Sequence, residues 1–303
     1  MFEKRFPTQI MIVLAIVLLA TAAFAARPAS ADHVAAECID TSGGSDSDRA
    51  VDRDDELYVI GLTVDQRLIC FGEDSPEDSD TIGQITGLAG DTSLVGIDYR
   101  PANNTLYGVG NSGGIYTVQG VNAMATKVSQ LSVTLRGTAF GVDVNPAADA
   151  LRIISNAGQN LRFSFAAGTT TVDGALTYPP ETTRATGVTA AAYTNNDSDP
   201  NTATTLYDID ARQDQVAIQS TANTGQLAPT GKLTVDTSLR VGFDIYSTVR
   251  DGSTVDVRGL ASLTVGGQAG LYRITLFSGK AVFQGAFSTN NRVIDIAIPL
   301  NQL

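Results

Sequence analysis

Imidazole and indole side chains are almost missing from this sequence of 303 residues. It has one histidine, His33, no tryptophan, two cysteines and three methionines. This scarcity excludes histidine-rich metal sites, c-type haem attachment and a disulfide-dense scaffold, because each needs several His or Cys residues at fixed spacing. A Ser-His-Asp triad is excluded too, since His33 precedes the part expected to fold. Few conventional routes to catalysis remain.

Positive charge is also in short supply. There are 20 Lys and Arg residues against 32 Asp and Glu residues, a formal net charge of -12. Nucleic acid is therefore excluded as a partner, because phosphate binding needs clustered cations. Hydrophobic residues make up 43% of the chain and charged residues 17%, so the sequence has enough apolar surface for a folded core.

The first 31 residues have the pattern of an export signal. Lys4 and Arg5 precede an apolar run from residue 10 to 24, and small residues follow before Ala25 and Ala31. We predict a cleavable signal peptide over residues 1–31, cut after Ala25 or Ala31. An uncleaved anchor is the alternative, but the run is shorter than the about 18 residues of a membrane span. The mature protein is thus expected to be secreted or held in a bacterial cell envelope, with no membrane span.

Residues 32–56 are polar and mostly acidic, and they predict a flexible leader. Export would place Cys38 and Cys70 in an oxidising compartment, where a pair of thiols usually forms a disulfide. The bridge would tie the leader to the folded domain. The alternative, a nucleophilic cysteine, lacks a base, because His33 is the only imidazole.

An internal repeat organises the rest of the chain, which is rich in short β-type runs separated by Gly, Asn, Asp and Pro. A Gly-apolar-Asp-apolar motif starts at Gly96, Gly141 and Gly242, recurs more weakly at Gly187, and ends as Val293-Ile294-Asp295-Ile296. The spacings between the glycines are 45, 46 and 55 residues. Four short strands per repeat of this length predict an all-β fold, a β-propeller, rather than a β-sandwich or β-helix.

The two ends of the folded part complement each other. The segment from Leu57 matches the second strand of a repeat, and the segment from Val293 to Pro299 matches the first strand. Together they make one unit beside four complete ones. We therefore predict a single domain over residues 57–303 with five four-stranded blades, in which the C-terminal strand closes the N-terminal blade. Closure would protect sheet edges that otherwise promote aggregation.

Several motifs resemble a known family. They include Gly61-Leu62-Thr63, Leu94-Val95-Gly96-Ile97-Asp98-Tyr99-Arg100-Pro101, Leu106-Tyr107-Gly108, Gly137-Thr138-Ala139-Phe140-Gly141-Val142-Asp143-Val144-Asn145-Pro146, Gly158-Gln159-Asn160-Leu161-Arg162, Val172-Asp173-Gly174-Ala175-Leu176, Ala191-Ala192-Tyr193-Thr194-Asn195-Asn196 and Gly242-Phe243-Asp244-Ile245. From about Leu57 to Phe287 the chain is similar to bacterial secreted proteins that carry the domain of unknown function 4394. This resemblance implies no particular activity.

One aspartate per repeat is the first candidate site. The repeat motif contains Asp98, Asp143, Asp244 and Asp295, with Thr189 in the remaining copy. First strands of propeller blades line the central channel, so these carboxylates could converge and hold a cation, most plausibly Ca²⁺. Alternatively, each accepts hydrogen bonds from the next blade and fixes the register between blades, as a residue found once per repeat usually does.

Two further segments could bind ligands. Asn195, Asp197, Asp199 and Asn201 offer oxygens at alternate positions, a partial Ca²⁺-loop pattern in which Pro200 replaces the usual glycine. A solvated turn is the alternative. A group of Arg and amide side chains surrounds the turn at residues 156–158 and could bind a carboxylate or a sugar. The group consists of Arg152, Arg162, Asn156, Gln159 and Asn160. These arginines could equally pair with acidic residues of neighbouring blades.

Two functional hypotheses follow. The first is a secreted, monomeric, non-catalytic binding or structural module that recognises an extracellular protein, a glycan or an envelope component. The second is a Ca²⁺-dependent hydrolase or lyase that uses the ring of aspartates, by analogy between folds alone. Whether the four aspartates converge, and whether a pocket there admits a substrate, distinguishes the two.

Overall fold

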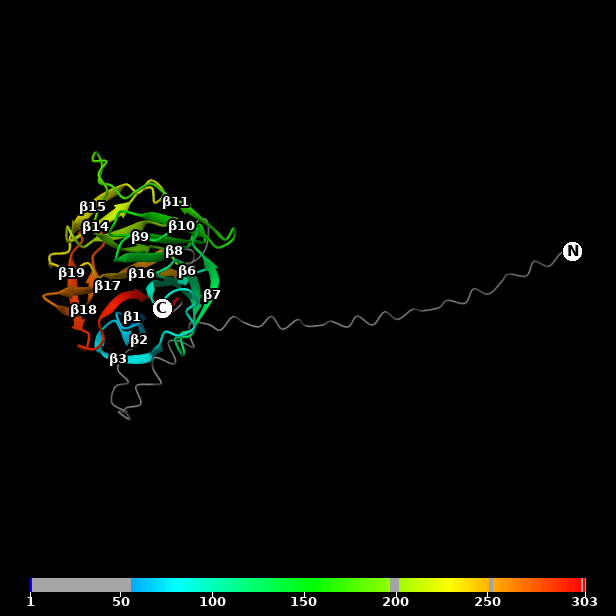
Figure 1. The fold of residues 1–303 in the computed structure, drawn as a ribbon, viewed down its shortest axis with the longest axis horizontal. Helices are drawn as coiled ribbons and strands as arrows, with labels where there is room; N and C mark the ends of the chain where they lie inside the picture. Colours follow the sequence, from blue (N-terminus) through cyan, green and yellow to red (C-terminus); the bar gives the residue numbers. More distant parts are fainter. Residues whose placement is uncertain (2–55, 197–201, 251–252, 301, 303) are drawn as a thin grey trace.

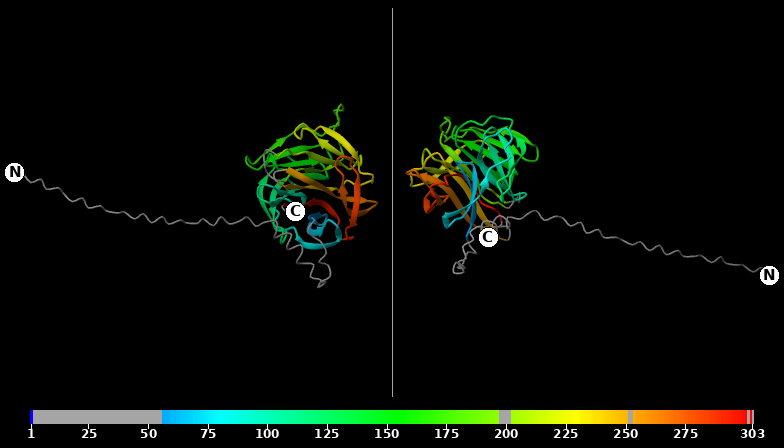
Figure 2. Two further views of the ribbon diagram at one scale, coloured as in Figure 1. Left: turned by 180° about the vertical axis from the view of Figure 1, so that it is seen from behind. Right: turned by 60° about the horizontal axis from the view of Figure 1, so that its bottom comes forward.

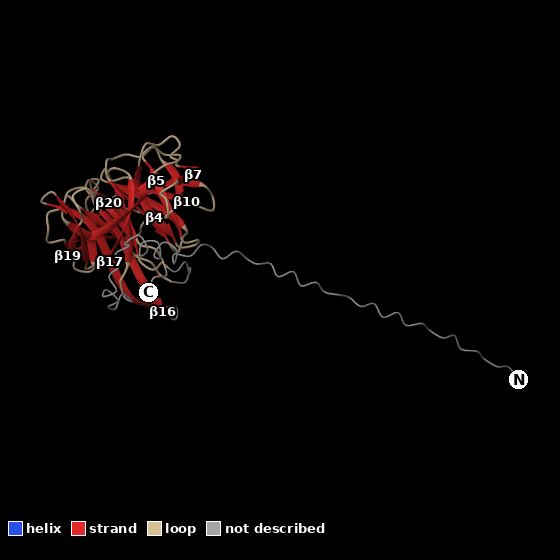
Figure 3. Cartoon of the chain, turned by 90° about the horizontal axis from the view of Figure 1, so that it is seen from below, coloured by secondary structure: helices blue, strands red, loops and turns tan. Residues whose placement is uncertain are grey.

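Five small antiparallel sheets arranged in a ring make up the fold (Figure 1). The computed structural model describes residues 1, 56–196, 202–250, 253–300 and 302. In this part of the chain there are 20 strands and no helix (Figure 3). The predicted signal peptide, nearly all of the predicted leader, and Cys38 lie outside the described residues. The predicted five-bladed β-propeller is confirmed.

Each blade has four strands, which are named below from the innermost, at the channel, to the outermost. Blade 1 consists of β4 (Leu94–Arg100), β5 (Thr105–Gly110), β6 (Gly114–Val118) and β7 (Ala125–Gln130). Blade 2 consists of β8 (Phe140–Asn145), β9 (Ala150–Ser155), β10 (Asn160–Ser164) and β11 (Thr169–Val172). Blade 3 consists of β12 (Val188–Tyr193), β13 (Leu206–Asp210), β14 (Gln215–Gln219) and β15 (Leu227–Lys232).

The last two blades depart from simple chain order or length. Blade 4 consists of β16 (Gly242–Arg250), β17 (Ser253–Val265), β18 (Gln268–Ile274) and β19 (Ala281–Ala286). Its first two strands are longer than those of the other blades, which explains part of the longer spacing in that repeat. Blade 5 joins both ends of the fold: β20 (Val293–Ala297), β1 (Tyr58–Thr63), β2 (Arg67–Gly72) and β3 (Ser75–Gln84).

Pairing between β20 and β1 closes the ring. The strands are antiparallel, with Ile60 opposite Ala297 and Gly61 opposite Ile296. The first and last strands therefore lie side by side, as both views of Figure 2 allow the reader to follow. The predicted closure by the C-terminal strand is confirmed. It gives β1 the hydrogen-bond partner that it would lack in an open array.

Burial decreases from the channel outward. Every residue of the innermost strand β12 is buried, whereas the outermost strand β7 alternates between exposed and half-buried positions after Ala125. Inner strands have a neighbouring blade on each side, so they tolerate continuous apolar sequence, while outer strands keep one face in water. The alternation in β7 and the apolar run in β12 follow from these two environments.

The hydrophobic core consists of one cluster at each blade-to-blade interface. Tyr107 and Val109 of blade 1, for example, pack with Val142 and Leu151 of blade 2. The other clusters join blades 2 and 3, 3 and 4, 4 and 5, and 5 and 1. Neighbouring blades are thus held together by apolar burial, and the inner strands form the wall of a narrow central channel.

Candidate functional site

The innermost strand of each blade is the edge of its sheet, so it has backbone N–H groups without a partner inside that sheet. Aspartates of three blades supply the missing acceptors. The N–H of Val144 donates to Asp98 over 2.7 Å, that of Tyr193 to Asp143 over 3.0 Å, and that of Ile298 to Asp244 over 2.6 Å. In each case the donor lies on the next blade. These carboxylates therefore fasten neighbouring inner strands to each other.

The same hydrogen bonds correct the predicted register of the repeat. The donors Val144, Tyr193 and Ile298 directly follow Asp143, Ala192 and Ala297, so the equivalent position holds Asp98, Asp143, Ala192, Asp244 and Ala297 in blades 1 to 5. Strand pairing agrees: Asp143 lies opposite Arg152 and Ala192 opposite Tyr207. Thr189 and Asp295 are thus not equivalent to the other aspartates, as the motif comparison predicted them to be.

Strand pairing also explains the error in blade 3. The pairing of β12 shifts between Val188 and Ala190, as that of β4 shifts between Leu94 and Gly96, so Ala190 is the residue equivalent to Gly96. The Gly187-Val188-Thr189 motif therefore lies three residues ahead of the place that the motif comparison gave it. In blade 5 the aspartate lies two residues before Ala297. Asp295 still bonds the next blade, because the Ile97 N–H donates to it over 2.8 Å.

The four carboxylates are close together and enclosed. Their residues expose only 6%, 3%, 3% and 2% of their surface, in the order Asp98, Asp143, Asp244, Asp295. One carboxylate oxygen from each of Asp98, Asp143 and Asp244 lies within 4.8 Å of the others. These three side chains could hold a metal ion, whereas Asp295 is not part of that group.

Burial raises the pKa values of all four groups, and repulsion between carboxylates adds to the shifts of Asp98, Asp143 and Asp295. Burial, opposed by the N–H donors of Ile298 and Ile245, raises the pKa of Asp244 to about 6. The pKa of Asp98 lies well above its usual range, first through burial and then through the charge of Asp244. The pKa values of Asp143 and Asp295 are raised in the same way. Several like charges in a dry channel must carry protons or a cation.

A pocket of about 250 Å³ lies at the end of the ring where the inner strands of four blades begin. We call it the mouth pocket. Its wall takes one residue from the start of the inner strand of four blades, Val95, Phe140, Val241 and Ile294. Each of these precedes the equivalent channel position by three residues, so this layer lies roughly 10 Å from the three carboxylates.

The mouth pocket is mainly apolar with one cation at its rim. Leu94, Ala139 and Leu239 add to its lining, and Arg240 is the charged member. The Arg240 guanidinium forms no ion pair with any carboxylate in the described part of the chain. Neither Phe140 nor Arg240 was singled out from the sequence, because only the ring arrangement brings these loops together.

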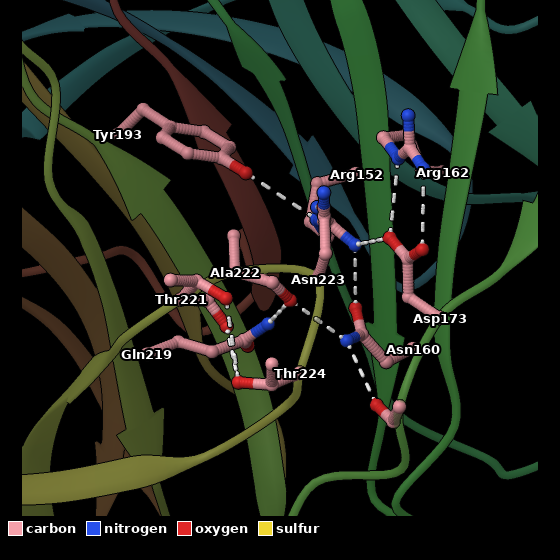
Figure 4. A network of polar contacts seen from close by, with 11 residues as sticks. Arg152, Asn160, Arg162, Asp173, Tyr193, Gln219, Thr221, Ala222, Asn223 and Thr224 are labelled. Atoms are coloured by element: carbon pink, nitrogen blue, oxygen red, sulfur yellow. Dashed lines mark hydrogen bonds and ion pairs between the residues drawn. The ribbon is translucent and has the colours of Figure 1, made fainter.

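Three members of the predicted Arg and amide group, Arg152, Asn160 and Arg162, belong to an internal network (Figure 4). Arg152 is 1% exposed and donates to Asp173 over 2.6 Å, to Asn160 over 2.8 Å and to Asn223 of blade 3 over 2.9 Å. Arg162 contacts the same Asp173 over 3.2 Å. The two arginines therefore share one carboxylate and link blades 2 and 3, and Arg152 is not accessible to a ligand.

The two remaining amides of that group stabilise loops. Asn156 accepts from the backbone of Thr138 over 2.9 Å and donates to its hydroxyl over 3.0 Å. Gln159 accepts from the backbone N–H of Arg136 over 2.8 Å and donates to the carbonyl of Thr134 over 3.0 Å. Both side chains therefore hold the connection between blades 1 and 2 against the turn between β9 and β10.

A buried acid near this network had no sequence signal. Asp208 in β13 is completely buried, and neither of its carboxylate oxygens has a hydrogen-bond partner among the described residues. Burial raises its pKa well above the usual range, although the charge of Arg152 opposes the shift. The Gln219 Oε1 atom in β14 is buried and without a partner as well. The surroundings of Asp208 therefore favour its protonated form.

The other sequence candidates are only partly placed. Asp197, Asp199 and Asn201 lie outside the described residues, and the Asn195 side chain accepts from the Thr254 hydroxyl over 2.5 Å. Cys70 is buried in β2, but Cys38 is not described, so the disulfide stays a prediction. Residues 110–114, Gly-Asn-Ser-Gly-Gly, were not singled out from the sequence, although they have the spacing of a nucleophile elbow. They span the end of β5, a turn and the start of β6, with no helix after them.

No helix in the described part of the chain is long and apolar enough to cross a membrane. That finding concerns helices alone.

Comparison with known proteins gives one family and several distant folds. A family model described as Domain of unknown function (DUF4394) matches residues 67–297, which confirms the resemblance seen in the sequence. No curated protein matches the chain.

Solved structures share only low similarity with the chain. A hydrazine synthase of Kuenenia stuttgartiensis is 13% identical, with a TM-score of 0.38, over 70% of this chain and 53% of the other. A protein of unknown function from Bacteroides thetaiotaomicron is 13% identical, with a TM-score of 0.45, over 76% and 56%. A protein from Lactobacillus plantarum is 16% identical, with a TM-score of 0.36, over 77% and 67%. The chain spans about half the length of the first two, and none of these similarities indicates an activity.

Proposed function

Since this chain belongs to the DUF4394 family, whose description assigns no activity, we propose from its geometry that it is a secreted, non-catalytic binding module whose ligand occupies the mouth pocket. The observation that carries the proposal is the difference in access between the channel aspartates and the mouth pocket. The aspartates are covered and bonded to the next blade, whereas the mouth pocket above them is open, apolar and lined by several blades.

The chemistry of the pocket defines the ligand class. Small-molecule sites are typically concave and mostly apolar, with a few polar groups that fix orientation. Val95, Phe140 and Val241 supply the apolar wall, and Arg240 supplies one positive charge at the rim. The preferred ligand is therefore a compact apolar group that carries a negative charge.

Secretion is the second element of the proposal. It is supported by the basic, apolar and small-residue segments of the first 31 residues and by the acidic composition of the chain. Fractionation of cells that produce the full chain tests it. The mature form is expected outside the cytoplasm, with an N-terminus just after Ala25 or Ala31, and retention of the uncut chain in the cytoplasm would contradict it.

Binding at the mouth pocket is tested with 8-anilinonaphthalene-1-sulfonate, a fluorescent probe with an apolar body and one negative charge. We expect saturable fluorescence with the folded protein. Ala139→Phe fills the pocket and should abolish the signal, and Arg240→Ala should weaken binding by about tenfold, as expected for one charge-assisted contact. The matched controls are Ala166→Phe and Arg212→Ala, at exposed positions outside the pocket. Equal binding by all variants would refute the proposal.

A second candidate function rests on the channel carboxylates. Oxygens of Asp98, Asp143 and Asp244 within 4.8 Å of one another suit a hard cation such as Ca²⁺. The ion would stabilise the ring by neutralising its charges. The role of such an ion in a hydrolase or lyase is less well supported, because a substrate would have to reach side chains that are almost fully covered. Measurement of Ca²⁺ binding distinguishes this candidate from aspartates that hold the blades together by hydrogen bonds alone.

A further inference from the structure

A second pocket lies on the same face of the propeller as the mouth pocket. Its volume is about 170 Å³, and its wall includes Arg136, Gln159, Asp173 and Arg184. We call it the arginine pocket. Both pockets use connections that lead from an outer strand to the next inner strand, and turns between second and third strands. Residues 133–140 contribute to both, so the two pockets are neighbours.

Two arginines of the arginine pocket lack acidic partners. Arg136 and Arg184 are both exposed, and neither forms an ion pair with a carboxylate in the described part of the chain. The carboxylate in the wall, Asp173, is already paired with Arg152 and Arg162. In a chain with a net charge of -12, two arginines without an acidic partner among the described residues thus line one pocket.

The two arginines are held by one turn. The backbone N–H of Arg136 donates to the Gln159 amide oxygen over 2.8 Å. The Arg184 stem packs over Gly158, where an added Cβ would lie 3.0 Å from the Arg184 Cβ. Gly158 also has a φ of +69°, which favours glycine. The backbone of Arg136 and the stem of Arg184 are therefore both positioned by residues 158 and 159.

We propose that the arginine pocket binds the carboxylate of a small sugar acid. Guanidinium groups bind carboxylates through paired hydrogen bonds, which fixes both position and orientation. Val133, Val172 and Ala175 complete the wall and offer apolar contact to the C–H face of a sugar ring. The inference extends the proposed binding function to a second pocket, and it adds the ligand class that the mouth pocket alone does not indicate.

The proposal is tested by calorimetric titration of the mature protein with galacturonate. We expect saturable binding that is weakened by at least about tenfold in the Arg136→Ala/Arg184→Ala variant, since two charge-assisted contacts are lost. Arg184→Glu alone should also weaken it. Arg240→Ala and Arg212→Ala should bind galacturonate as the wild type does. Circular dichroism and melting temperature of each variant verify that it is folded.

Three outcomes would overturn the proposal: no saturable binding of galacturonate, unchanged binding in the double variant, or equally tight binding of inorganic phosphate. The last would identify a general anion pocket without preference for a carboxylate. Galacturonate and the fluorescent probe report different pockets, so the two proposals can fail separately. Probe binding without galacturonate binding would refute the sugar-acid site and leave the mouth pocket intact.

Discussion

Raising the pH is expected to destabilise this protein between about pH 4 and about pH 6. The pKa of Asp244 is about 6 in the folded protein against 3.8 for an ordinary aspartate. In that interval the folded state retains a proton that the unfolded state has released. Stability conferred by the proton is therefore complete below about pH 4 and is lost as the pH rises through the folded pKa.

The size of the effect follows from the shift of one group. A difference of about 2 pKa units corresponds to about 3 kcal/mol of unfolding free energy. Asp98, Asp143 and Asp295 have pKa values raised for the same reasons, so they act in the same direction and extend the loss to higher pH. The ring as a whole is thus expected to lose at least that amount.

Urea denaturation followed by circular dichroism, in chelator-treated buffers across this range, measures the effect. Asp143→Asn removes one charge from the ring and retains an oxygen that can accept from the Tyr193 N–H, so its stability should fall less steeply with pH. Asp236→Asn, at an exposed position, should behave as the wild type. A stability that rises from pH 4 to pH 6, or a steeper fall in Asp143→Asn, would refute the reasoning.

Three further changes test other parts of the structure. Asp244→Asn should destabilise the protein by about 1–3 kcal/mol in urea denaturation, because both of its carboxylate oxygens accept backbone N–H groups and an amide nitrogen cannot; stability equal to that of the wild type would contradict this. Arg152→Met should lower the free energy of unfolding by about 3–5 kcal/mol, since it leaves buried Asp173 with only the partly exposed Arg162. A loss of stability no larger than that of Arg162→Ala would show that the buried pair is not important. Asp208→Asn should raise the melting temperature at about pH 8, where an unpartnered buried carboxylate is most costly, and a lower melting temperature would indicate a partner for the charged form.

The number of blades could be predicted because the repeat motif recurs at spacings of 45, 46 and 55 residues, which is room for four short strands. The Gly-apolar-Asp motifs at Gly96, Gly141 and Gly242 all mark inner strands. The complementary ends at Leu57 and Val293 fixed the closure. These features depend on local sequence and on the hydrophobic pattern, which every blade repeats.

The register of the channel could not be predicted in the same way. In blade 3 the Gly187 motif lies three residues ahead of its expected place, and the equivalent position holds Ala192, which no motif marks. In blade 5 the aspartate lies two residues earlier than in blades 1, 2 and 4. The register of a strand depends on its hydrogen bonding to the partner strand, so similarity of short motifs does not show it.

Polar contacts between residues far apart in the chain could not be predicted from the sequence either. The partners of Arg152 include Asp173 and Asn223, and these lie on different connections of the chain. The sequence indicated a group of Arg and amide residues near residues 156–158 but not that Arg152 is buried. The two unpaired arginines, Arg136 and Arg184, attracted no attention as single residues. The loops that carry them meet at the turn between β9 and β10 because the blades are arranged in a ring.

We propose that the channel aspartates hold the blades together through hydrogen bonds rather than through a metal ion, and that ligands bind above them. Equilibrium dialysis of the mature protein against Ca²⁺ at about pH 7.5, with wild type and Asp143→Asn in parallel, tests it most directly. A site filled at a hundredfold excess over its dissociation constant would also add about 2.7 kcal/mol of stability. We expect no stoichiometric Ca²⁺ and no change in melting temperature. One ion per wild-type chain that is lost in Asp143→Asn, with a Ca²⁺-dependent rise in melting temperature, would contradict it.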